Sequence, residues 1–101
     1  YYTSDFNHFQ WIDAKNNWYM SDIFFFFSFK GLIPDFDLVE ICSENQYIYS
    51  KSGTLILQDV EKDKKYEIKI SEKTFVKFYY KDQILSIFTN EGITNYKIVT
   101  P

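Results

Sequence analysis

Carboxylates are the side chains in this sequence most able to do chemistry, and four of them lie close together. They are Asp35, Asp37, Glu40 and Glu44. Paired carboxylates can hydrolyse glycosides, and clustered carboxylates can hold Ca²⁺. The segment lacks the glycine and the spaced oxygen ligands of a calcium-binding loop, and 101 residues supply little room for a sugar-hydrolase cleft. We therefore interpret the cluster as a solvated acidic edge and expect no metal site and no cofactor.

The chain has one histidine, His8, and one cysteine, Cys42. A lone histidine cannot build a multi-histidine metal site. A catalytic cysteine needs an electropositive surround that lowers its thiol pKa, whereas Cys42 has Glu40 and Glu44 as neighbours. We predict that Cys42 is a small buried hydrophobic residue. Because no phosphate-binding loop and no nucleophile elbow occur either, we expect no catalytic residues and a protein that is not an enzyme.

The charged residues argue against nucleic acid as a partner. All eleven basic residues are lysines, the net charge is −3 and the isoelectric point is near 5.0. Arginine is the residue that reads guanine and grips phosphate with two hydrogen bonds, and it is missing. The single cysteine excludes an intramolecular disulfide and fits a cytoplasmic location. The apolar run of residues 23–29 is far shorter than the ~20 residues of a membrane-spanning helix.

The aromatic fraction of 22% favours β-structure, because aromatic side chains suit a pleated, half-buried surface. From residue 36 onward, short runs that alternate polar and apolar residues are separated by polar turns. The expected strands carry Lys65–Ile70, Thr54–Gln58, Val76 with Phe78 and Tyr80, Leu85 with Ile87, and Tyr96 with Ile98. This pattern predicts a mainly β protein, built as an antiparallel meander sheet or a small barrel.

The first third of the chain is open to two interpretations. Ser4 and Asp5 could cap a short helix, or His8–Asp13 could be a strand that turns at residues 14–17. We favour a short helical or irregular segment. The run Phe24–Phe29 is apolar at both alternating sets of positions, so we expect a strand buried on both faces. The whole chain, 1–101, is then one β domain with an N-terminal lead at 1–20 and a meander at 21–101.

A shift of thirty residues brings similar residues into register. It superposes Tyr49, Lys51, Leu55, Glu61, Tyr66 and Ile68 on Tyr79, Lys81, Leu85, Glu91, Tyr96 and Ile98. Tyr19, Phe25, Phe27, Phe36 and Leu38 match after a further shift back. The shift indicates repeats of about thirty residues and three strands. The segment YIYSKSGTLILQDVEKDKKYEI resembles the hairpins of β-propeller blades, although such blades usually have four strands and about 40 residues or more.

Charge and aromatic content suggest a binding protein. Residues 1–45 carry seven acidic side chains and two lysines, whereas residues 46–101 carry seven acidic side chains and nine lysines. An acidic half can steer a basic partner toward the chain. Exposed Tyr and Trp side chains contribute strongly to binding surfaces, and the candidates for such exposure are Trp11, Trp18, Tyr19, Tyr47, Tyr79 and Tyr80. The candidate partner-binding residues are Asp13, Trp18, Tyr19, Asp22, Asp35, Asp37, Glu40 and Glu44.

In size, charge and composition the chain resembles the small immunity proteins that bacteria pair with secreted toxins. The resemblance rests on no motif and transfers no functional residues. It implies an inhibitor that blocks the active site of a basic toxin domain. Two other functions fit the same residues: a small-ligand or carbohydrate-binding module with exposed aromatic rings, and a piece of a larger β-repeat protein.

Overall fold

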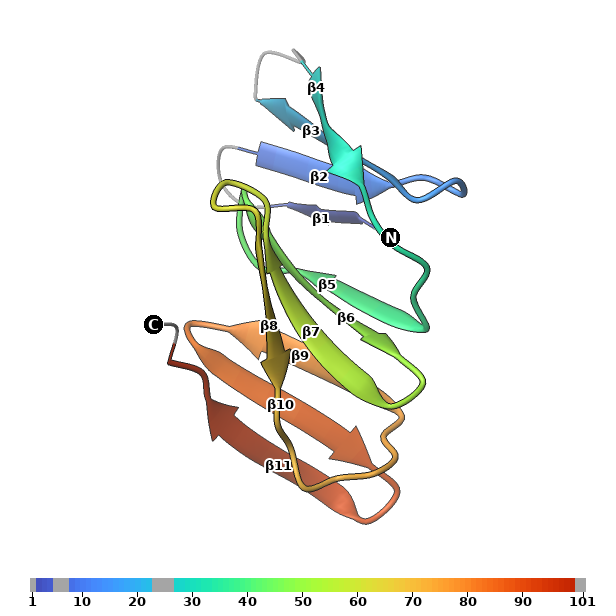
Figure 1. Cartoon of the computed structure of the whole chain (residues 1–101), viewed down its shortest axis with the longest axis vertical. Helices are drawn as coiled ribbons and strands as arrows, with labels where there is room; N and C mark the ends of the chain where they lie inside the picture. The colour runs from blue at the N-terminus through green and yellow to red at the C-terminus, as the bar shows by residue number, and fades with distance from the viewer. Residues whose placement is uncertain (1, 5–7, 23–26, 100–101) are drawn as a thin grey trace. The chain divides into compact units, whose positions relative to one another are not determined.

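The computed structural model describes residues 2–4, 8–22 and 27–99 (Figure 1). These residues form eleven strands and no helix, and every strand pairing is antiparallel. The mainly β prediction is therefore confirmed. The described strands form open sheets rather than a closed barrel. No helix of these residues is long and apolar enough to cross a membrane. The contacts divide the chain into two compact units, Tyr1–Phe36 and Asp37–Pro101.

Unit 1 consists of sheet 1, in which four strands follow one another in chain order. They are β1 (Tyr2–Ser4), β2 (His8–Ile12), β3 (Asn17–Asp22) and β4 (Phe27–Leu32). The expectation of a short helical or irregular lead is wrong, because the described residues there are strands. Alternation decides the matter: Phe9 and Trp11 lie on one face of β2, and Gln10 and Ile12 lie on the other.

The β2–β3 turn is closed by the carboxylate of Asp13. Its Oδ1 accepts hydrogen bonds from the backbone N–H groups of Lys15 at 2.9 Å and Asn17 at 3.0 Å. Asn16 adopts the left-handed conformation, with a φ of 65°, which asparagine tolerates better than most residues. Aspartate and asparagine thus supply the hydrogen bonds and the backbone angle that this turn requires.

Unit 2 contains two more meanders. Sheet 2 is built from β5 (Leu38–Ile41), β6 (Gln46–Lys51), β7 (Thr54–Asp59) and β8 (Lys64–Ile68). Sheet 3 is built from β9 (Lys77–Lys81), β10 (Ile84–Thr89) and β11 (Gly92–Lys97). The five runs that alternation predicts after residue 36 fall on β7, β8, β9, β10 and β11, with some ends that differ by one or two residues, whereas β5 and β6 were not among them. Among the described residues, β11 pairs with β10 alone and is an edge strand.

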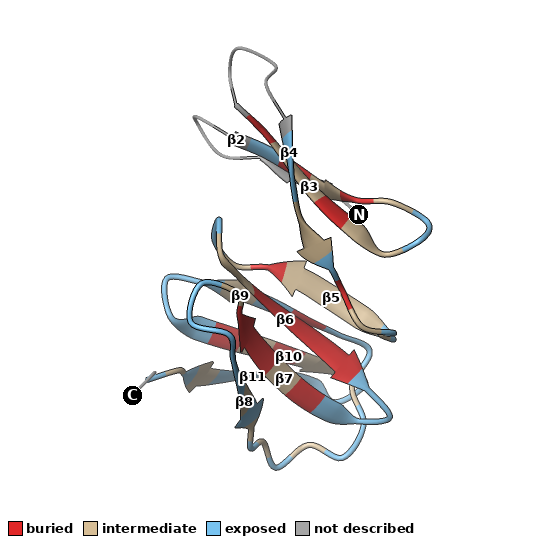
Figure 2. Ribbon diagram, turned by 45° about the horizontal axis from the view of Figure 1, so that its top comes forward, coloured by how far each residue is buried: buried red, intermediate tan, exposed pale blue. Residues whose placement is uncertain are grey.

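Buried residues of sheets 2 and 3 form one core, and the strands that carry them are partly or wholly red in Figure 2. The core combines residues of β6, β7, β9 and β10: Ile48, Leu55, Leu57, Phe78, Leu85 and Ile87, each at most 5% exposed. The side chains of Tyr47 and Tyr49 alternate with Ile48 and lie on the opposite face of sheet 2, where they are 3% and 4% exposed. Both faces of sheet 2 therefore carry buried residues.

Two hairpins of unit 2 share the same tight turn. The β6–β7 loop is Ser52 and Gly53, with φ angles of 52° and 83°, and the β9–β10 loop is Asp82 and Gln83, with 52° and 68°. Positive φ at both central residues is the two-residue hairpin turn that matches the twist of the flanking strands. Only one of the four positions is a glycine, so the other three residues occupy an unfavourable region.

The strands recur with two spacings. The offset of thirty residues superposes the hairpin of β6 and β7 on that of β9 and β10, as the sequence indicates. Whole sheets recur at a longer spacing, because their second strands begin at His8, Gln46 and Ile84, which are 38 residues apart each time. At the 38-residue spacing β5, β6 and β7 fall on β9, β10 and β11, whereas at the thirty-residue spacing β6, β7 and β8 do.

The aromatic run near residue 25 does not match its prediction. Residues 23–26, including Phe24 and Phe25, lie outside the described residues. The rest of the run belongs to β4, where Ser28 is exposed and Phe29 is 59% exposed. The expectation of a strand buried on both faces is therefore wrong: aromatic content at both alternating positions did not mean that both faces are covered.

Candidate functional site

The predicted acidic residues of unit 1 lie in three different segments of the chain. Asp13 serves the β2–β3 turn, and the N–H donors of that turn hold the pKa of its carboxyl below the usual value, the bond from Asn17 contributing most. Asp22 ends β3, and its side chain lies outside the described residues. Asp35 is exposed in the segment after β4. The structure thus gives Asp13 a structural role that its spacing in the sequence does not reveal.

The predicted acidic residues of unit 2 lie along β5 and its flanks. Asp37 accepts a hydrogen bond from the N–H of Ser52 at 2.9 Å, and its other oxygen lies 3.9 Å from the ammonium of Lys51. Glu40 is half-buried within β5, and Glu44 is exposed in the turn that follows. Asp37 therefore anchors the β6–β7 hairpin. The carboxylate of Asp37 is exposed, and one of its oxygens accepts a bond that holds this hairpin.

The two aromatic residues among the partner-binding candidates, Trp18 and Tyr19, have different environments. Trp18 is fully buried, and its Nε1–H donates a 2.9 Å hydrogen bond to Oε1 of Gln10, which is itself 5% exposed. Trp18 is thus part of the interior of the protein and cannot present its ring to a partner. Tyr19 is half-buried and lies on the opposite face of sheet 1.

Tyr19 belongs to a row of four rings that crosses three strands, which we call the aromatic face: Phe9, Trp11, Tyr19 and Phe29. The ring centroids are 5.6 Å apart for Phe9 and Trp11, 5.5 Å for Trp11 and Tyr19, and 5.7 Å for Tyr19 and Phe29. These are the cross-strand aromatic contacts that stabilise a sheet. Both ends of the row are exposed, since Phe9 is 42% and Phe29 is 59% accessible.

Of this row, the sequence identified Trp11 and Tyr19 as aromatic candidates and missed Phe9 and Phe29. That Phe9 and Trp11 share a face would have followed from treating residues 8–13 as a strand, because positions two apart share a face. The β3–β4 pairing changes register between Trp18 and Tyr19, and this bulge sets Phe29 opposite Tyr19. No pattern in the sequence marks that change of register.

A second exposed apolar surface lies on the side of sheet 3 that faces away from sheet 2. We call it the outer face of sheet 3: Tyr79, Ile84, Ser86, Phe88, Ile93 and Asn95. Tyr79 is 49% exposed, Ile84 is 40% and Ile93 is 61%. At its centre, the hydroxyl of Ser86 donates a 2.7 Å hydrogen bond to Oδ1 of Asn95. The ammonium of Lys77 lies 4.8 Å from the centroid of the Phe88 ring.

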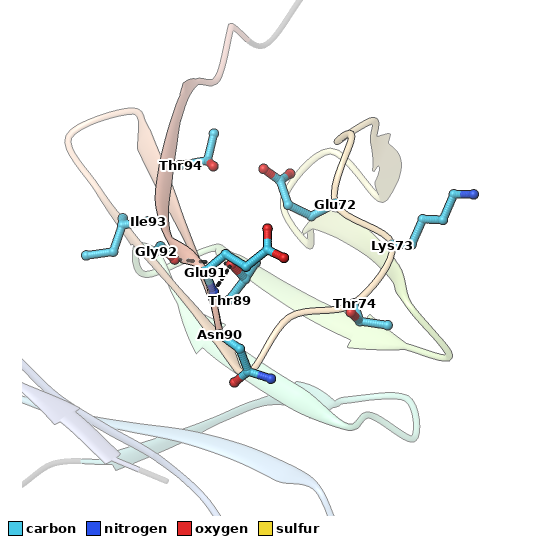
Figure 3. Close-up of a pocket in the computed structure, with 9 residues that line it drawn as sticks. All are labelled: Glu72, Lys73, Thr74, Thr89, Asn90, Glu91, Gly92, Ile93 and Thr94. Atoms are coloured by element: carbon cyan, nitrogen blue, oxygen red, sulfur yellow. Dashed lines mark hydrogen bonds between the residues drawn. The ribbon is translucent and has the colours of Figure 1, made fainter.

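A polar hollow of about 490 Å³ lies between the loop after β8 and the β10–β11 turn (Figure 3). Glu72 from the loop and Glu91 from the turn extend into the space between them. Tyr96 fixes the loop: its hydroxyl donates to Oε2 of Glu72 at 2.6 Å and lies 2.9 Å from Oγ of Ser71. The bond from Tyr96 is the main reason that the pKa of Glu72 lies below its usual value. We interpret these hydrogen bonds as the contacts that hold the loop after β8 against β11.

The remaining titratable groups of note belong to the interior. Cys42 packs against the core of unit 2, and desolvation raises the pKa of its thiol well above the usual value. Desolvation also raises the pKa of Tyr47 to about 12. A thiol that resists ionisation is a poor nucleophile. Within residues 2–4, 8–22 and 27–99, no three His, Cys, Asp or Glu side chains come together as metal ligands.

Comparison with known proteins gave no match: no protein-family model, no curated protein and no solved structure resembles the chain at a significant level. The function has to be argued from the geometry of the chain itself. The two exposed apolar surfaces, the aromatic face and the outer face of sheet 3, are its most distinctive features.

Proposed function

We propose that this chain is a protein-binding module and that the aromatic face of sheet 1 is its contact surface. The observation that carries the proposal is the row of four contacting rings with both ends exposed. Aromatic side chains give a large contact area at a low cost in conformational entropy, so they dominate protein-binding surfaces. Packing against each other also holds these rings in place before a partner arrives.

The arrangement of the rings favours a protein partner over a sugar. A sugar-binding platform needs a ring that offers its flat side to the ligand. Trp11 and Tyr19 instead stack on each other with an interplanar angle of 20°, so each covers one side of its neighbour. The most exposed rings of the row are Phe9 and Phe29 at its two ends. A broad apolar protein surface suits such a ridge better than a single sugar does.

In its narrower form, the proposal makes the chain a cytoplasmic inhibitor that occludes the active site of a basic bacterial toxin domain. The net charge of −3 supports attraction of a basic partner. Asp13 and Asp37 hold turns together, so we assign the contact to the aromatic face and leave long-range steering to the acidic side chains. The chain itself then needs no catalytic residue, cofactor or metal.

The experiment is capture with matched variants. The chain, Phe29→Ser and Val99→Ser are immobilised in parallel, exposed to lysate of the native host, and their stoichiometric partners are identified by mass spectrometry. Phe29 belongs to the aromatic face, whereas Val99 is 78% exposed and lies beyond β11 in unit 2. We expect one protein to bind the wild type and Val99→Ser, and to bind Phe29→Ser much more weakly. Equal recovery by all three proteins would contradict the assignment to the aromatic face.

A further inference from the structure

The repeat relates the faces of the three sheets to one another. With an offset of 38 residues, β6 falls on β10 and β7 falls on β11. Ile48 and Leu55, which pack against sheet 3, then correspond to Ser86 and Ile93 on the outer face of sheet 3. The outer face of sheet 3 is therefore equivalent to a face that in sheet 2 is covered by the next sheet.

The same offset relates the aromatic face to the core of unit 2. Two offsets of 38 residues carry Phe9 to Leu85 and Trp11 to Ile87. Leu85 and Ile87 are fully buried because sheet 2 covers them. The aromatic face thus occupies the position that, in sheet 3, packs against the preceding sheet. Phe9 is nevertheless 42% exposed.

The two exposed faces therefore correspond to the two sides of one interface that already exists in this protein. In unit 2, the side formed by Ile48, Leu55 and Leu57 packs against the side formed by Leu85 and Ile87. The outer face of sheet 3 is equivalent to the first side, and the aromatic face is equivalent to the second. Ile93 and Phe9 are apolar like their equivalents Leu55 and Leu85, whereas Ser86 and Asn95 are polar where Ile48 and Leu57 are apolar.

We propose that the aromatic face of one copy of this chain binds the outer face of sheet 3 of a second copy, so that the copies associate head to tail and repeat between copies the packing of sheet 2 on sheet 3. This inference rests on the proposed function, because it uses the aromatic face as a protein-binding surface. The contact joins two different surfaces, so it leaves one free surface of each kind on a pair of copies and extends into a ring or a filament.

The first arm of the test measures the molar mass of the purified chain by light scattering at increasing concentration. We expect the mass to rise with concentration. Ile93→Lys and Phe29→Lys each place a charge on one of the two faces and should weaken association roughly tenfold or more. Val99→Lys adds the same charge elsewhere and should leave association unchanged. Circular dichroism and thermal unfolding check that each variant is folded, and Tyr79→Lys replaces Ile93→Lys if that variant is not.

The second experiment mixes the Ile93→Lys and Phe29→Lys variants. A copy with Ile93→Lys keeps its aromatic face, and a copy with Phe29→Lys keeps its sheet 3 face. A head-to-tail contact predicts that the mixture forms a one-to-one pair that grows no further, although each variant alone is monomeric. A contact between two identical faces would gain nothing from mixing, and that result would overturn the proposal.

The remaining outcomes separate this inference from the proposed function. A wild-type chain that stays monomeric at every concentration overturns the head-to-tail contact. So does association that neither variant weakens. In both cases the host capture experiment still decides the proposed function, since a different protein recovered through Phe29 would preserve it. Loss of Phe29-dependent capture together with a monomeric wild type would overturn both.

Discussion

Sheets 2 and 3 are neighbours with the same consecutive strand order, but they differ in how much of their surface is buried. Sheet 2 carries buried residues on both faces, with Ile48 fully buried on one and Tyr49 4% exposed on the other. Sheet 3 buries Leu85 and Ile87 on one face, whereas Ile93 on its other face is 61% exposed. The meander topology therefore does not determine burial. The two sheets differ in whether their second face is covered by other residues.

The variant with the largest expected effect on stability removes a core side chain of sheet 3. Ile87→Ala should lower the free energy of unfolding by about 2–5 kcal/mol, because the side chain is fully buried between two sheets and its loss leaves a cavity. Ile93→Ala, one strand away on the exposed face, should change it by less than about 0.5 kcal/mol. Urea unfolding followed by circular dichroism measures both. Similar losses for the two variants would show that the outer face is not the exposed surface described above.

The second test compares the tight turns of the two sheets. Gly53 has a φ of 83°, and a Cβ there would lie 3.5 Å from the backbone oxygen of Lys73, so Gly53→Ala should cost about 1 kcal/mol through the backbone angle rather than through a clash. Gln83 has a φ of 68° at the equivalent place in sheet 3, so Gln83→Gly should gain about 0.5 kcal/mol. Thermal unfolding of both variants checks the opposite signs. A stabilising Gly53→Ala would contradict the turn assignment.

The third test concerns the hydrogen bond from Tyr96 on β11 to Glu72 in the loop after β8. Tyr96→Phe removes the hydroxyl that donates to Glu72, so it should destabilise unit 2 at neutral pH. Because the pKa of Glu72 is lowered in the folded state, its stabilising effect is fully present above the unfolded pKa, near 4.5, and is lost as the pH falls through the lower folded value. The difference between the variant and the wild type should therefore shrink below about pH 4.5.

Tyr66→Phe is the matched control for that experiment. Tyr66 also packs on the core of unit 2, but the structure shows no hydrogen bond from its hydroxyl. Its replacement should leave the pH profile of stability unchanged. A Tyr96→Phe profile that runs parallel to the wild type from pH 3 to pH 7 would mean that the Tyr96–Glu72 bond contributes nothing to stability.

Five of the seven strands after residue 36, β7 to β11, could be predicted from the sequence because alternation and turn residues agree there. The run from Thr54 to Gln58 differs from β7 by one residue at its end. The N-terminal region was harder, because capping residues at Ser4 and Asp5 favour a helix while the alternation in residues 8–12 favours a strand. Pairing with β3 settles the conflict, and such long-range pairing cannot be deduced from local propensity.

The candidate site was less predictable than the fold. A carboxylate such as Asp13 or Asp37 has the same appearance in the sequence whether it meets a partner or accepts backbone N–H bonds in a turn. Trp18 could not be distinguished from an exposed tryptophan, because its burial depends on contacts that the local sequence does not encode. Charge and residue type therefore identified candidates, and only the register between strands showed which of them share a face.

The smallest expected effect on stability is also the most direct test of what sets the two sheets apart. Asn95 on β11 corresponds, at the 38-residue offset, to Leu57 on β7, which is 1% exposed. Asn95→Leu gives sheet 3 the side chain that sheet 2 has, at the expense of one exposed hydrogen bond from Ser86. If burial depends on a covering sheet, the isolated chain should unfold within about 0.5 kcal/mol of the wild type, because nothing in unit 2 covers the new leucine. The same variant should associate with itself more strongly in light scattering, since the added apolar area is buried only in the head-to-tail contact. A large gain in stability at concentrations where the chain is monomeric would instead show that the outer face of sheet 3 is already covered within one copy.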